Sequence, residues 1–551
     1  MPDQALESRP SARTKPRLDF QQHLADLEAQ GLLIRIDRPI NKDTELHPLV
    51  RWQFIGGMPE EQRKAFLFTN VVDGHGKKYA MPVVLGALAA SAQIYAQGMG
   101  RKVDEIGTAW MEAINHPIPP LRVNAGACQE VVIKGDDLKK PGGGLASLPV
   151  PVSTPGFDSA PYLTATLCIT RDPDSGIPNM GMYRAALKAT DRLAVRMAAV
   201  TGGAGGYQHW LKYRARKEKM PIAIVLGAAP VVCFTSPQKL PIDLDELAVA
   251  GGLAGEPIKT VKAVTIDLDV PADAELVIEG LIDTSMAEPE APFGESNGYL
   301  ALEAFNMPMQ VTAITRKKNA VFCAILSQVT PSESSLIKRV AYEPLYLSHL
   351  RDTLGVKGVK RVLLHEPLTN LRPVIMVQLA RGTARTEVWR ALHGASTFMA
   401  HAGKICIAVS EDIEPSNCDA LFWSMGYRCN PIEDVLLVPY HGGQQGDRRS
   451  VDSAMLIDAT QKRDMPPLAL PKKEFMENAR KIWEELGLPP VTLRAPWHGY
   501  SLGHWNEMWD LFAKRAAESD WEVNGKETLA RSRSSIEPET PAWKVEKPAQ
   551  K

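Results

Sequence analysis

Cysteine is scarce in this sequence, and its few cysteines are not spaced as ligand or disulfide pairs. The 551 residues include seven cysteines, an odd number without any C-x-x-C motif. We therefore expect neither a disulfide framework nor a structural zinc site, and we predict a reducing compartment. The N-terminal segment MPDQALESRPSARTKPR lacks the apolar core of a signal peptide, so the predicted location is the cytoplasm.

Long apolar runs and an excess of either charge are also absent. The longest nearly apolar stretch, Ile222 to Phe234, contains Gly227 and Pro230 and is shorter than a membrane span, so it predicts a buried strand with its turn. The 63 Lys and Arg residues nearly balance the 64 Asp and Glu residues. This balance argues against a nucleic-acid binder, which normally carries a basic face or arm.

Several common catalytic motifs are missing. The sequence has no G-x-S-x-G, no H-E-x-x-H and no Walker pattern with Gly-Lys-Ser/Thr. The glycine-rich stretch GGAGG at 202–206 does not have the G-x-G-x-x-G spacing of a dinucleotide-binding turn. Serine-hydrolase, zincin and P-loop interpretations therefore have no support.

What is present predicts a mixed α/β (α+β) protein of several domains. β-Branched runs between Gly, Pro and Asp turns fill a central region, and helices alternate with strands on either side of it. Asp19 and Gln22 have the spacing of a helix cap, and the tail contains one amphipathic helix around 506–519. The predicted segments are a disordered N-terminus (1–16), an N-terminal α/β domain (17–117), a β-barrel-like domain (118–335), a C-terminal α/β domain (336–470), and a helical extension with a loose tail (471–551).

A short segment with two glutamates has the composition of an active-site turn. Glu290 and Glu295 are five positions apart, and side chains alternate along a strand, so the two cannot lie on one face of a straight strand. We expect Pro292 to hold Ala291 extended and Gly294 to adopt a positive φ, so that the chain wraps and both carboxylates enter one cavity. Taken alone, the same segment also fits a solvated acidic turn.

Together with other segments, this turn resembles one enzyme family. The main matches, in chain order, are NMGMYR (179–184), LDELAVAGGLAGEP (244–257) and EAPFGE (290–295). Further matches are IAIVLGAAP (222–230), IAVSEDIEP (407–415) and MLIDAT (455–460). As an ordered set they resemble the UbiD family of prenylated-FMN-dependent decarboxylases, from about residue 17 to at least residue 470.

The resemblance implies an architecture and a set of catalytic residues. The central domain would be a split β-barrel that binds flavin, flanked by an N-terminal α/β domain and a C-terminal α/β oligomerisation domain. Arg184 matches the family's active-site arginine, Glu290 its partner and Glu295 the proton donor. Arginine can hold a carboxylate through two parallel hydrogen bonds. We expect the glutamate beside it to be ionised and a second, desolvated glutamate to keep a proton.

The resemblance also implies where the cofactor and its ions bind. In this family a divalent cation (Mn²⁺, Mg²⁺ or Fe²⁺) and K⁺ bind the flavin phosphate. The implied metal ligands are Asn179, His209 and Glu246, and an alternative alignment puts Gly205 in place of His209. The implied cofactor-binding residues are Asn179, Met180, Gly181, Met182, Arg184, Gln208 and His209. One departure is Ala291, where the family commonly has glycine.

These inferences predict a reversible, non-oxidative decarboxylase of an aromatic, heteroaromatic or α,β-unsaturated carboxylic acid. Whether the substrate is a free acid or an aryl-CoA thioester such as phthaloyl-CoA stays open. The implied partners are a separate flavin prenyltransferase and further copies of the chain in a homodimer or homohexamer. Two other classes stay open: a flavin oxidoreductase on a similar barrel, and a non-catalytic oligomeric scaffold, against which the set of Arg184, Glu290 and Glu295 argues.

Overall fold

The computed structural model divides the chain into two compact units. The first comprises Met1–Ser410 with Cys429–Thr460, and the second comprises Glu411–Arg428 with Gln461–Lys551. The described residues are 15–198, 204–238, 240, 244–296, 298–366, 373–399, 402–441, 452–462, 465–491, 500–501, 506–534 and 536–542. Most of the segment predicted to be disordered at the N-terminus lies outside them. Within these ranges, no helix is both long and apolar enough to cross a membrane.

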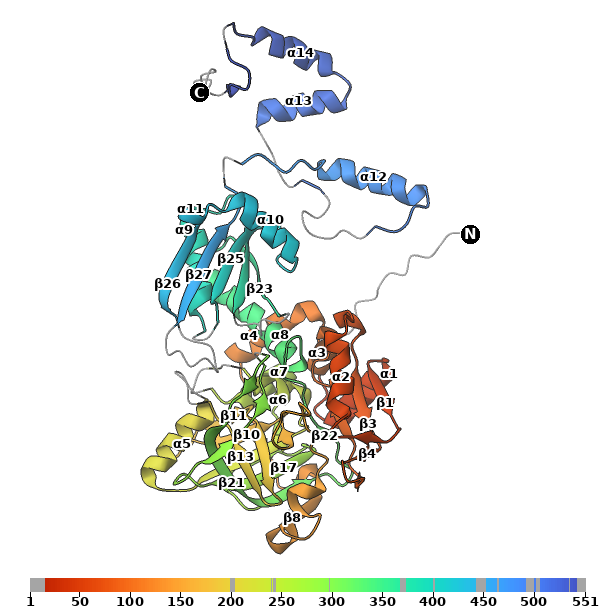
Figure 1. Cartoon of the computed structure of the whole chain (residues 1–551), viewed down its shortest axis with the longest axis vertical. Coiled ribbons are helices and arrows are strands. Elements are labelled where there is room, and N and C mark those ends of the chain that lie inside the picture. Colours follow the sequence, from red (N-terminus) through yellow and green to blue (C-terminus); the bar gives the residue numbers. More distant parts are fainter. Residues whose placement is uncertain are drawn as a thin grey trace. The chain divides into compact units, whose positions relative to one another are not determined.

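The first unit begins with a region of short helices and strands (Figure 1). Its elements are α1 (Phe20–Ala29), β1 (Leu33–Ile36), β2 (Ile40–Asn41), α2 (Leu46–Ile55), β3 (Ala65–Phe68), β4 (Val71–Val72), β5 (Lys78–Tyr79), β6 (Val83–Leu85), α3 (Ala92–Met99) and α4 (Ile106–Asn115). The predicted start of α1 is confirmed, because the Asp19 side chain accepts the backbone N–H of Gln22 at 2.9 Å. Phe20, Leu24 and Leu27 form the buried face of this helix.

The N-terminal sheet takes its last strand from a distant part of the chain. Its strand order is β1-β3-β6-β22, and β22 (Phe322–Cys323) follows the long strands of the central region. β22 runs parallel to β6, with Phe322 opposite Val83. One hydrophobic core contains buried residues from both regions, from Phe20 to Ala341. The N-terminal region is therefore packed onto the central region through shared apolar side chains.

The central region contains the strands that carry the predicted site. Its elements are β7 (Leu121–Arg122), β8 (Val131–Lys134), β9 (Tyr162–Leu163), β10 (Leu167–Arg171), β11 (Pro178–Gly181), β12 (Ala185–Ala189), β13 (Arg192–Val195), α5 (Gly205–Arg216), β14 (Met220–Leu226), α6 (Pro230–Thr235), α7 (Glu246–Ala254), β15 (Lys259–Lys262), β16 (Asp269–Pro271), β17 (Leu276–Ile282), β18 (Glu288–Glu290), β19 (Phe293–Gly294), β20 (Leu300–Ala301) and β21 (Ala304–Arg316). The stretch Ile222–Phe234, predicted as a strand with its turn, contains most of β14 and then the helix α6. Pro230 allows this helix because the first turn needs no N–H and fits the fixed φ of proline.

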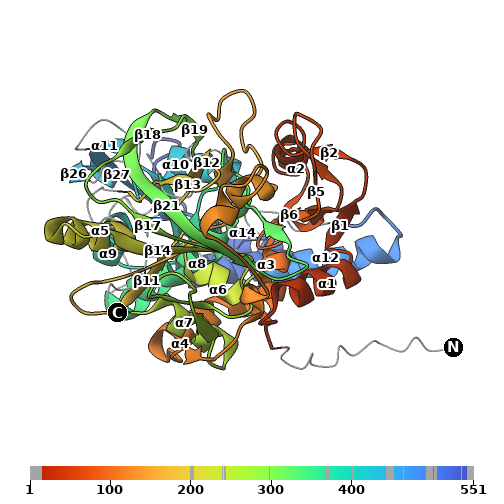
Figure 2. The same cartoon turned by 90° about the horizontal axis from the view of Figure 1, so that it is seen from below.

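Ten of these strands form one antiparallel sheet. Its path is β11-β10-β14-β17-β21-β13-β12-β9, and β8 and β18 also pair with β21. Figure 2 shows β18 beside the long β21, on the side of the molecule where β12 and β13 also lie. β18 and β13 pair with adjacent parts of β21, and β12 pairs with β13, so the start of β12 comes close to the turn after β18, although about a hundred residues separate them in sequence.

The C-terminal region of the first unit is a second layered structure with its own core. Its elements are α8 (Glu333–Ser348), β23 (Val359–Leu364), β24 (Val374–Leu379), α9 (Arg385–Thr397), β25 (Ile405–Ser410), α11 (Pro431–Asp434), β26 (Val435–His441) and β27 (Asp452–Ala459). The five strands have the order β23-β24-β25-β27-β26, with parallel pairing at the centre. Helices alternate with strands as predicted, and α8 and α9 contribute buried residues to the core beside this sheet.

The second unit is helical where it is described. Its helices are α10 (Cys418–Arg428), α12 (Lys473–Glu485), α13 (Glu507–Ala517) and α14 (Trp521–Ala530). The helix predicted around 506–519 is confirmed as α13, which Asn506 caps. The prediction of a single helix in the tail was wrong, since α12 and α14 are additional. Neither of these begins with a side-chain cap, so the sequence offers a weaker start signal for them.

Candidate active site

Arg184 lies at the centre of the site, between β11 and β12. Its carbonyl oxygen accepts the backbone N–H of Arg196 at 3.0 Å, and the neighbouring carbonyl of Tyr183 accepts the hydroxyl of Thr166 at 2.5 Å. Its guanidinium carbon is 4.7 Å from the ring centre of Phe293, within the range of a cation–π contact. The Arg184 side chain is 9% exposed, so water screens its charge only weakly.

Arg184 binds both predicted glutamates. Its Nε and Nη2 donate to the two carboxylate oxygens of Glu290 at 2.9 and 3.0 Å, a two-bond fork between residues 106 positions apart. Its Nη1 donates to Oε1 of Glu295. Burial opposes the charge of Arg184, but the hydrogen bond to Glu290 and the charge of Glu295 raise its pKa above the ordinary value. The structure therefore brings together the three residues that we predicted to be catalytic.

The two glutamates differ in burial, in the sense opposite to our expectation. Glu290 is fully buried and also accepts a hydrogen bond from Nδ2 of Asn306 at 3.0 Å. The Glu295 side chain is 22% exposed, so the proposed proton donor is not the desolvated member of the pair. Both carboxylates can still bind Arg184, because one guanidinium has five N–H groups.

The turn between the glutamates is also built differently from the prediction. Ala291 has a φ of 92°, in the left-handed region that favours glycine, whereas Gly294 has no positive φ and lies in β19. Gly294 is needed for space, because a Cβ there would lie 2.5 Å from Oγ1 of Thr154 and 2.6 Å from Cγ of Gln328. Contacts of the turn with the rest of the protein thus outweigh the local preference of a residue before proline.

Arg196 is a residue of this site that the sequence prediction missed. Its Nη1 donates to Oε1 of Glu295 at 2.5 Å, so this oxygen accepts from two guanidinium groups. Arg196 follows β13, which pairs with β12 and places Arg196 opposite Arg184. The signal in the sequence was the short Thr190-Asp191 connection between two strands, which sets this register.

The predicted metal ligands lie around β11 and its neighbours. Asn179 is on β11, opposite Thr170 of β10. Glu246 begins α7, and its Oε2 accepts the backbone N–H of Met180 at 2.9 Å. Burial raises the pKa of Glu246 to about 7, and no Lys or Arg side chain among the described residues counters this shift. Glu246 is therefore a buried carboxylate without a cationic partner in the described part of the chain.

Gly205 and His209 lie one helical turn apart on α5. Gly205 contacts Asn179 closely, since a Cβ there would lie 1.9 Å from the amide oxygen Oδ1. Nδ1 of His209 forms a hydrogen bond with Oγ1 of Thr170 at 2.9 Å, and burial lowers the pKa of His209. A neutral ring held at one nitrogen has its Nε2 available for a cation, the usual arrangement of histidine ligands. On α5, Gly205 lies directly beside the Asn179 amide.

The donor groups fit a hard cation next to a phosphate. Asn179 and Glu246 offer an amide and a carboxylate oxygen, which such cations prefer. A cation beside Glu246 would offset the cost of burying its charge. No group of three or more His, Cys, Asp and Glu side chains is placed to hold a metal in the described ranges, and the predicted set has only two residues of these types. The other predicted cofactor residues lie on β11, just after it or on α5: Met180 is buried, Gly181 ends β11, and Met182 and Gln208 are half-buried.

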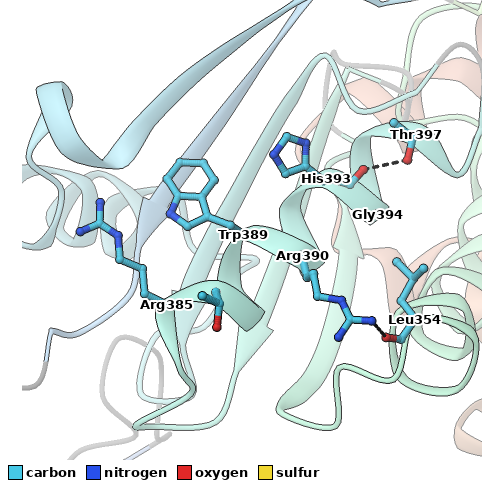
Figure 3. A pocket seen from close by; sticks show the side chains of 8 residues that line it. Leu354, Arg385, Trp389, Arg390, His393, Gly394 and Thr397 are labelled. Atoms are coloured by element: carbon cyan, nitrogen blue, oxygen red, sulfur yellow. Dashed lines mark hydrogen bonds between the residues drawn. The ribbon is translucent and has the colours of Figure 1, made fainter.

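A groove with a volume of about 640 Å³ lies along α9 in the C-terminal region, and Figure 3 shows the side chains that line it. Its lining residues are Leu354, Arg385, Thr386, Trp389, Arg390, His393, Gly394 and Thr397. The two arginines already have partners: Arg385 pairs with Asp434 at 3.1 Å, and Arg390 donates to the carbonyl oxygen of Leu354 at 2.6 Å. None of the predicted site residues lines this groove, so it is separate from the predicted active site.

Three domain models of one family match the chain in sequence. They describe the N-terminal domain (residues 24–114), the Rift-related domain (121–329) and the C-terminal domain (335–459) of 3-octaprenyl-4-hydroxybenzoate carboxy-lyase. The matches follow one another without overlap and include every residue that we predicted for the site. They establish a three-domain architecture of mixed α/β content.

Solved structures of similar proteins agree with this match. HmfF from Pelotomaculum thermopropionicum in complex with FMN is 28% identical, with 84% of this chain and 99% of that chain covered and a TM-score of 0.73. An evolved dimeric form of HmfF in complex with prFMN is 27% identical, with 83% and 97% covered and a TM-score of 0.71. The closed form of vanillic acid decarboxylase from Sedimentibacter hydroxybenzoicus is 25% identical, with 86% and 99% covered and a TM-score of 0.72. The chain therefore belongs to the UbiD family and is a UbiD-type carboxy-lyase.

Proposed function

We propose that this chain catalyses the reversible, non-oxidative decarboxylation of an aromatic, heteroaromatic or α,β-unsaturated carboxylic acid with prenylated FMN. The observation that carries the proposal is the guanidinium of Arg184, which binds Glu290 through two nitrogens and reaches Glu295 with the third. The relatives support it, because HmfF binds prFMN or FMN and the S. hydroxybenzoicus enzyme is a vanillic acid decarboxylase.

The protein supplies binding and proton transfer in this proposal. Loss of CO₂ from an sp² carbon leaves an electron pair that no side chain can accept, and prenylated FMN, when bound, supplies the electron sink. Glu290 is fully buried and holds Nε and Nη2 of Arg184, which fixes the guanidinium plane. Nη1 is then the N–H group that Arg184 turns toward the carboxylate of the acid.

Substrate binding gives Glu295 a physical reason to take up a proton. Nη1 of Arg184 donates to Oε1 of Glu295. A substrate carboxylate at the same N–H would bring a third carboxylate to a shielded site that already contains Glu290 and Glu295, and it would repel Glu295. Protonation of Glu295 removes the repulsion and prepares it as a donor. After the C–C bond breaks and CO₂ leaves, Glu295 gives its proton to the carbon that carried the carboxylate, and it takes a proton back in the reverse direction.

The proposal extends to the cofactor site and to the assembly. Asn179, Glu246 and Nε2 of His209 would hold a divalent cation, Mn²⁺ or else Mg²⁺ or Fe²⁺, at the flavin phosphate together with K⁺. The flavin would lie beside Met180, Gly181, Met182 and Gln208 on a central sheet that forms a split barrel. A separate prenyltransferase would supply the modified flavin, and the C-terminal domain would join copies of the chain in a homodimer or homohexamer.

The identity of the bound cofactor, together with turnover, tests the proposal. The full chain is produced with a flavin prenyltransferase, and the extracted cofactor is identified by its absorption spectrum and mass. CO₂ release is measured with vanillic acid, 3,4-dihydroxybenzoic acid, cinnamic acid and phthaloyl-CoA. We expect a flavin with an added prenyl-derived ring and CO₂ release from at least one of these acids. Ordinary flavin that NAD(P)H bleaches would support an oxidoreductase, and a protein with neither flavin nor turnover would support a scaffold.

A further inference from the structure

The turn that carries Glu295 rests on a loop just before β9. Oδ1 of Asp158 accepts the backbone N–H of Gly294, the residue directly before Glu295, at 3.1 Å. The backbone N–H of Ser159 donates to the carbonyl oxygen of Pro292 at 3.2 Å. Two adjacent residues of the loop therefore hold the turn at two points, and both points lie within three residues of Glu295.

Asp158 is itself held in a fixed orientation by its own loop. Its Oδ2 accepts the backbone N–H groups of Ser153 at 3.1 Å and Thr154 at 2.7 Å, which directs Oδ1 to Gly294. Burial raises the pKa of Asp158, and the hydrogen bonds from the backbone oppose this shift. Because all three partners are donors, the arrangement needs both carboxylate oxygens as acceptors.

A second support of the turn comes from the N-terminal region through Gln328. The turn lies so close to this side chain that a Cβ at Gly294 would be 2.6 Å from its Cγ. Gln328 is 3% exposed, and Arg51 of α2 donates to its carbonyl oxygen at 3.2 Å and to its Oε1 at 2.7 Å. Burial lowers the pKa of Arg51 to about 10, and the charge of Asp158 acts against this shift.

We propose that Asp158 and Arg51 are positioning residues for the reaction, because they hold the turn so that Glu295 meets Arg184 and delivers its proton. The inference rests on the proposed role of Glu295 as proton donor. Asp158 acts through the backbone of Gly294, and Arg51 acts through Gln328. Misplacement of a catalytic group by about 1 Å can slow a reaction about 10²-fold. Loss of either residue should therefore lower kcat, while KM and flavin content stay the same.

Two variants of the full, cofactor-loaded chain test this inference. In Asp158→Asn, one acceptor oxygen becomes an NH₂ group facing backbone N–H donors, and Arg51→Met removes the donors that hold Gln328. On an acid from the panel that the unmodified protein decarboxylates, we expect kcat to fall about 10- to 100-fold in each, with KM and flavin content unchanged. Asp73→Asn is the matched control, since Asp73 also accepts two backbone N–H groups, at 2.9 and 3.0 Å, but in a hairpin of the N-terminal region.

An unchanged kcat in both variants overturns the inference, and so does a fall in kcat that a loss of flavin explains. A crystal structure of Asp158→Asn gives a readout that does not depend on turnover. Oε1 of Glu295 should be beyond hydrogen-bond distance from Nη1 of Arg184, and an unmoved Glu295 contradicts the proposed role. If Asp158→Asn does not fold, the kcat and flavin content of Arg51→Met decide whether the inference holds. Failure of the proposed function looks different, because the unmodified protein would then release no CO₂ from any acid of the panel.

Discussion

Nη1 of Arg196 lies 2.5 Å from Oε1 of Glu295. The same oxygen accepts Nη1 of Arg184, so two guanidinium groups share one acceptor. A substrate carboxylate that takes Nη1 of Arg184 would leave Arg196 as the cation that still holds Glu295. We therefore expect Arg196 to keep Glu295 in place while Arg184 exchanges Glu295 for the substrate carboxylate. One arginine could not bind both groups through the same N–H.

Glu295→Gln should retain prenylated FMN and lose most of its turnover. The amide keeps the size of the side chain but cannot donate a proton to the product carbon, and general acid catalysis typically contributes about 10²–10⁴-fold. Flavin content and CO₂ release of the purified variant check both parts. Glu303→Gln is the matched control, because Glu303 is exposed just before β21 and should leave turnover unchanged. Full activity in Glu295→Gln would refute its role as proton donor.

Glu246→Ala should lower divalent metal and flavin content together, because its carboxylate is proposed to share one cation with the flavin phosphate. If Nε2 of His209 is the third ligand, His209→Ala should lower both nearly as much. Elemental analysis and flavin absorbance of the purified variants measure this without turnover. His393→Ala, a change on α9, serves as the control. If the metal content of His209→Ala is unchanged, His209 is not a ligand. Gly205 then occupies the aligned position, and water completes the coordination of the cation.

His47 should make the protein sensitive to acid. It is fully buried, neither ring nitrogen has a hydrogen-bond partner among the described residues, and burial lowers its pKa to about 3. Since the unfolded chain binds a proton near pH 6.5 and the folded chain does not, the stabilisation is present above that pH and is lost as the pH falls toward 3. The slope for one such group is about 1.4 kcal/mol per pH unit.

The variant His47→Leu tests this acid sensitivity directly. The free energy of unfolding of the first cooperative transition is measured in urea between pH 4 and 8 for both proteins. The advantage of the leucine variant should grow as the pH falls below about 6.5. His75→Leu, in an exposed hairpin, should not show this pH dependence. A difference between the two proteins that is constant across this range would exclude the explanation.

Ala291→Gly should stabilise the turn between the glutamates. At a φ of 92°, Ala291 is in a region that L side chains rarely adopt, and glycine relieves about 1 kcal/mol of such strain. The urea midpoint of the first transition should rise. Ala301→Gly in β20 is the matched control, and it should lower the midpoint because glycine weakens an ordinary strand position. A lower midpoint in Ala291→Gly would show that the alanine methyl group contributes more by packing than it costs in strain.

Local patterns along the chain determined much of what could be predicted. The cap of α1 depends on residues three positions apart, and the amphipathic helix α13 depends on the periodicity of a few neighbouring residues. The ordered motifs pointed to Arg184, Glu290 and Glu295, and the structure places these three side chains in contact. Helices and strands can be recognised in the sequence because their side-chain patterns repeat every 3.6 or 2 residues and do not depend on distant segments.

Only the tertiary structure decided how these pieces meet. Arg196 reaches Glu295 across 99 positions of sequence, and Arg51 reaches Gln328 across 277. The φ of Ala291 reverses the local expectation because its turn is held by contacts from other regions. The physical reason is that a hydrogen bond between distant residues depends on the order and register of strands from several regions. One guanidinium hydrogen-bonds two glutamates only after that order is set, and no pattern of neighbouring residues encodes it.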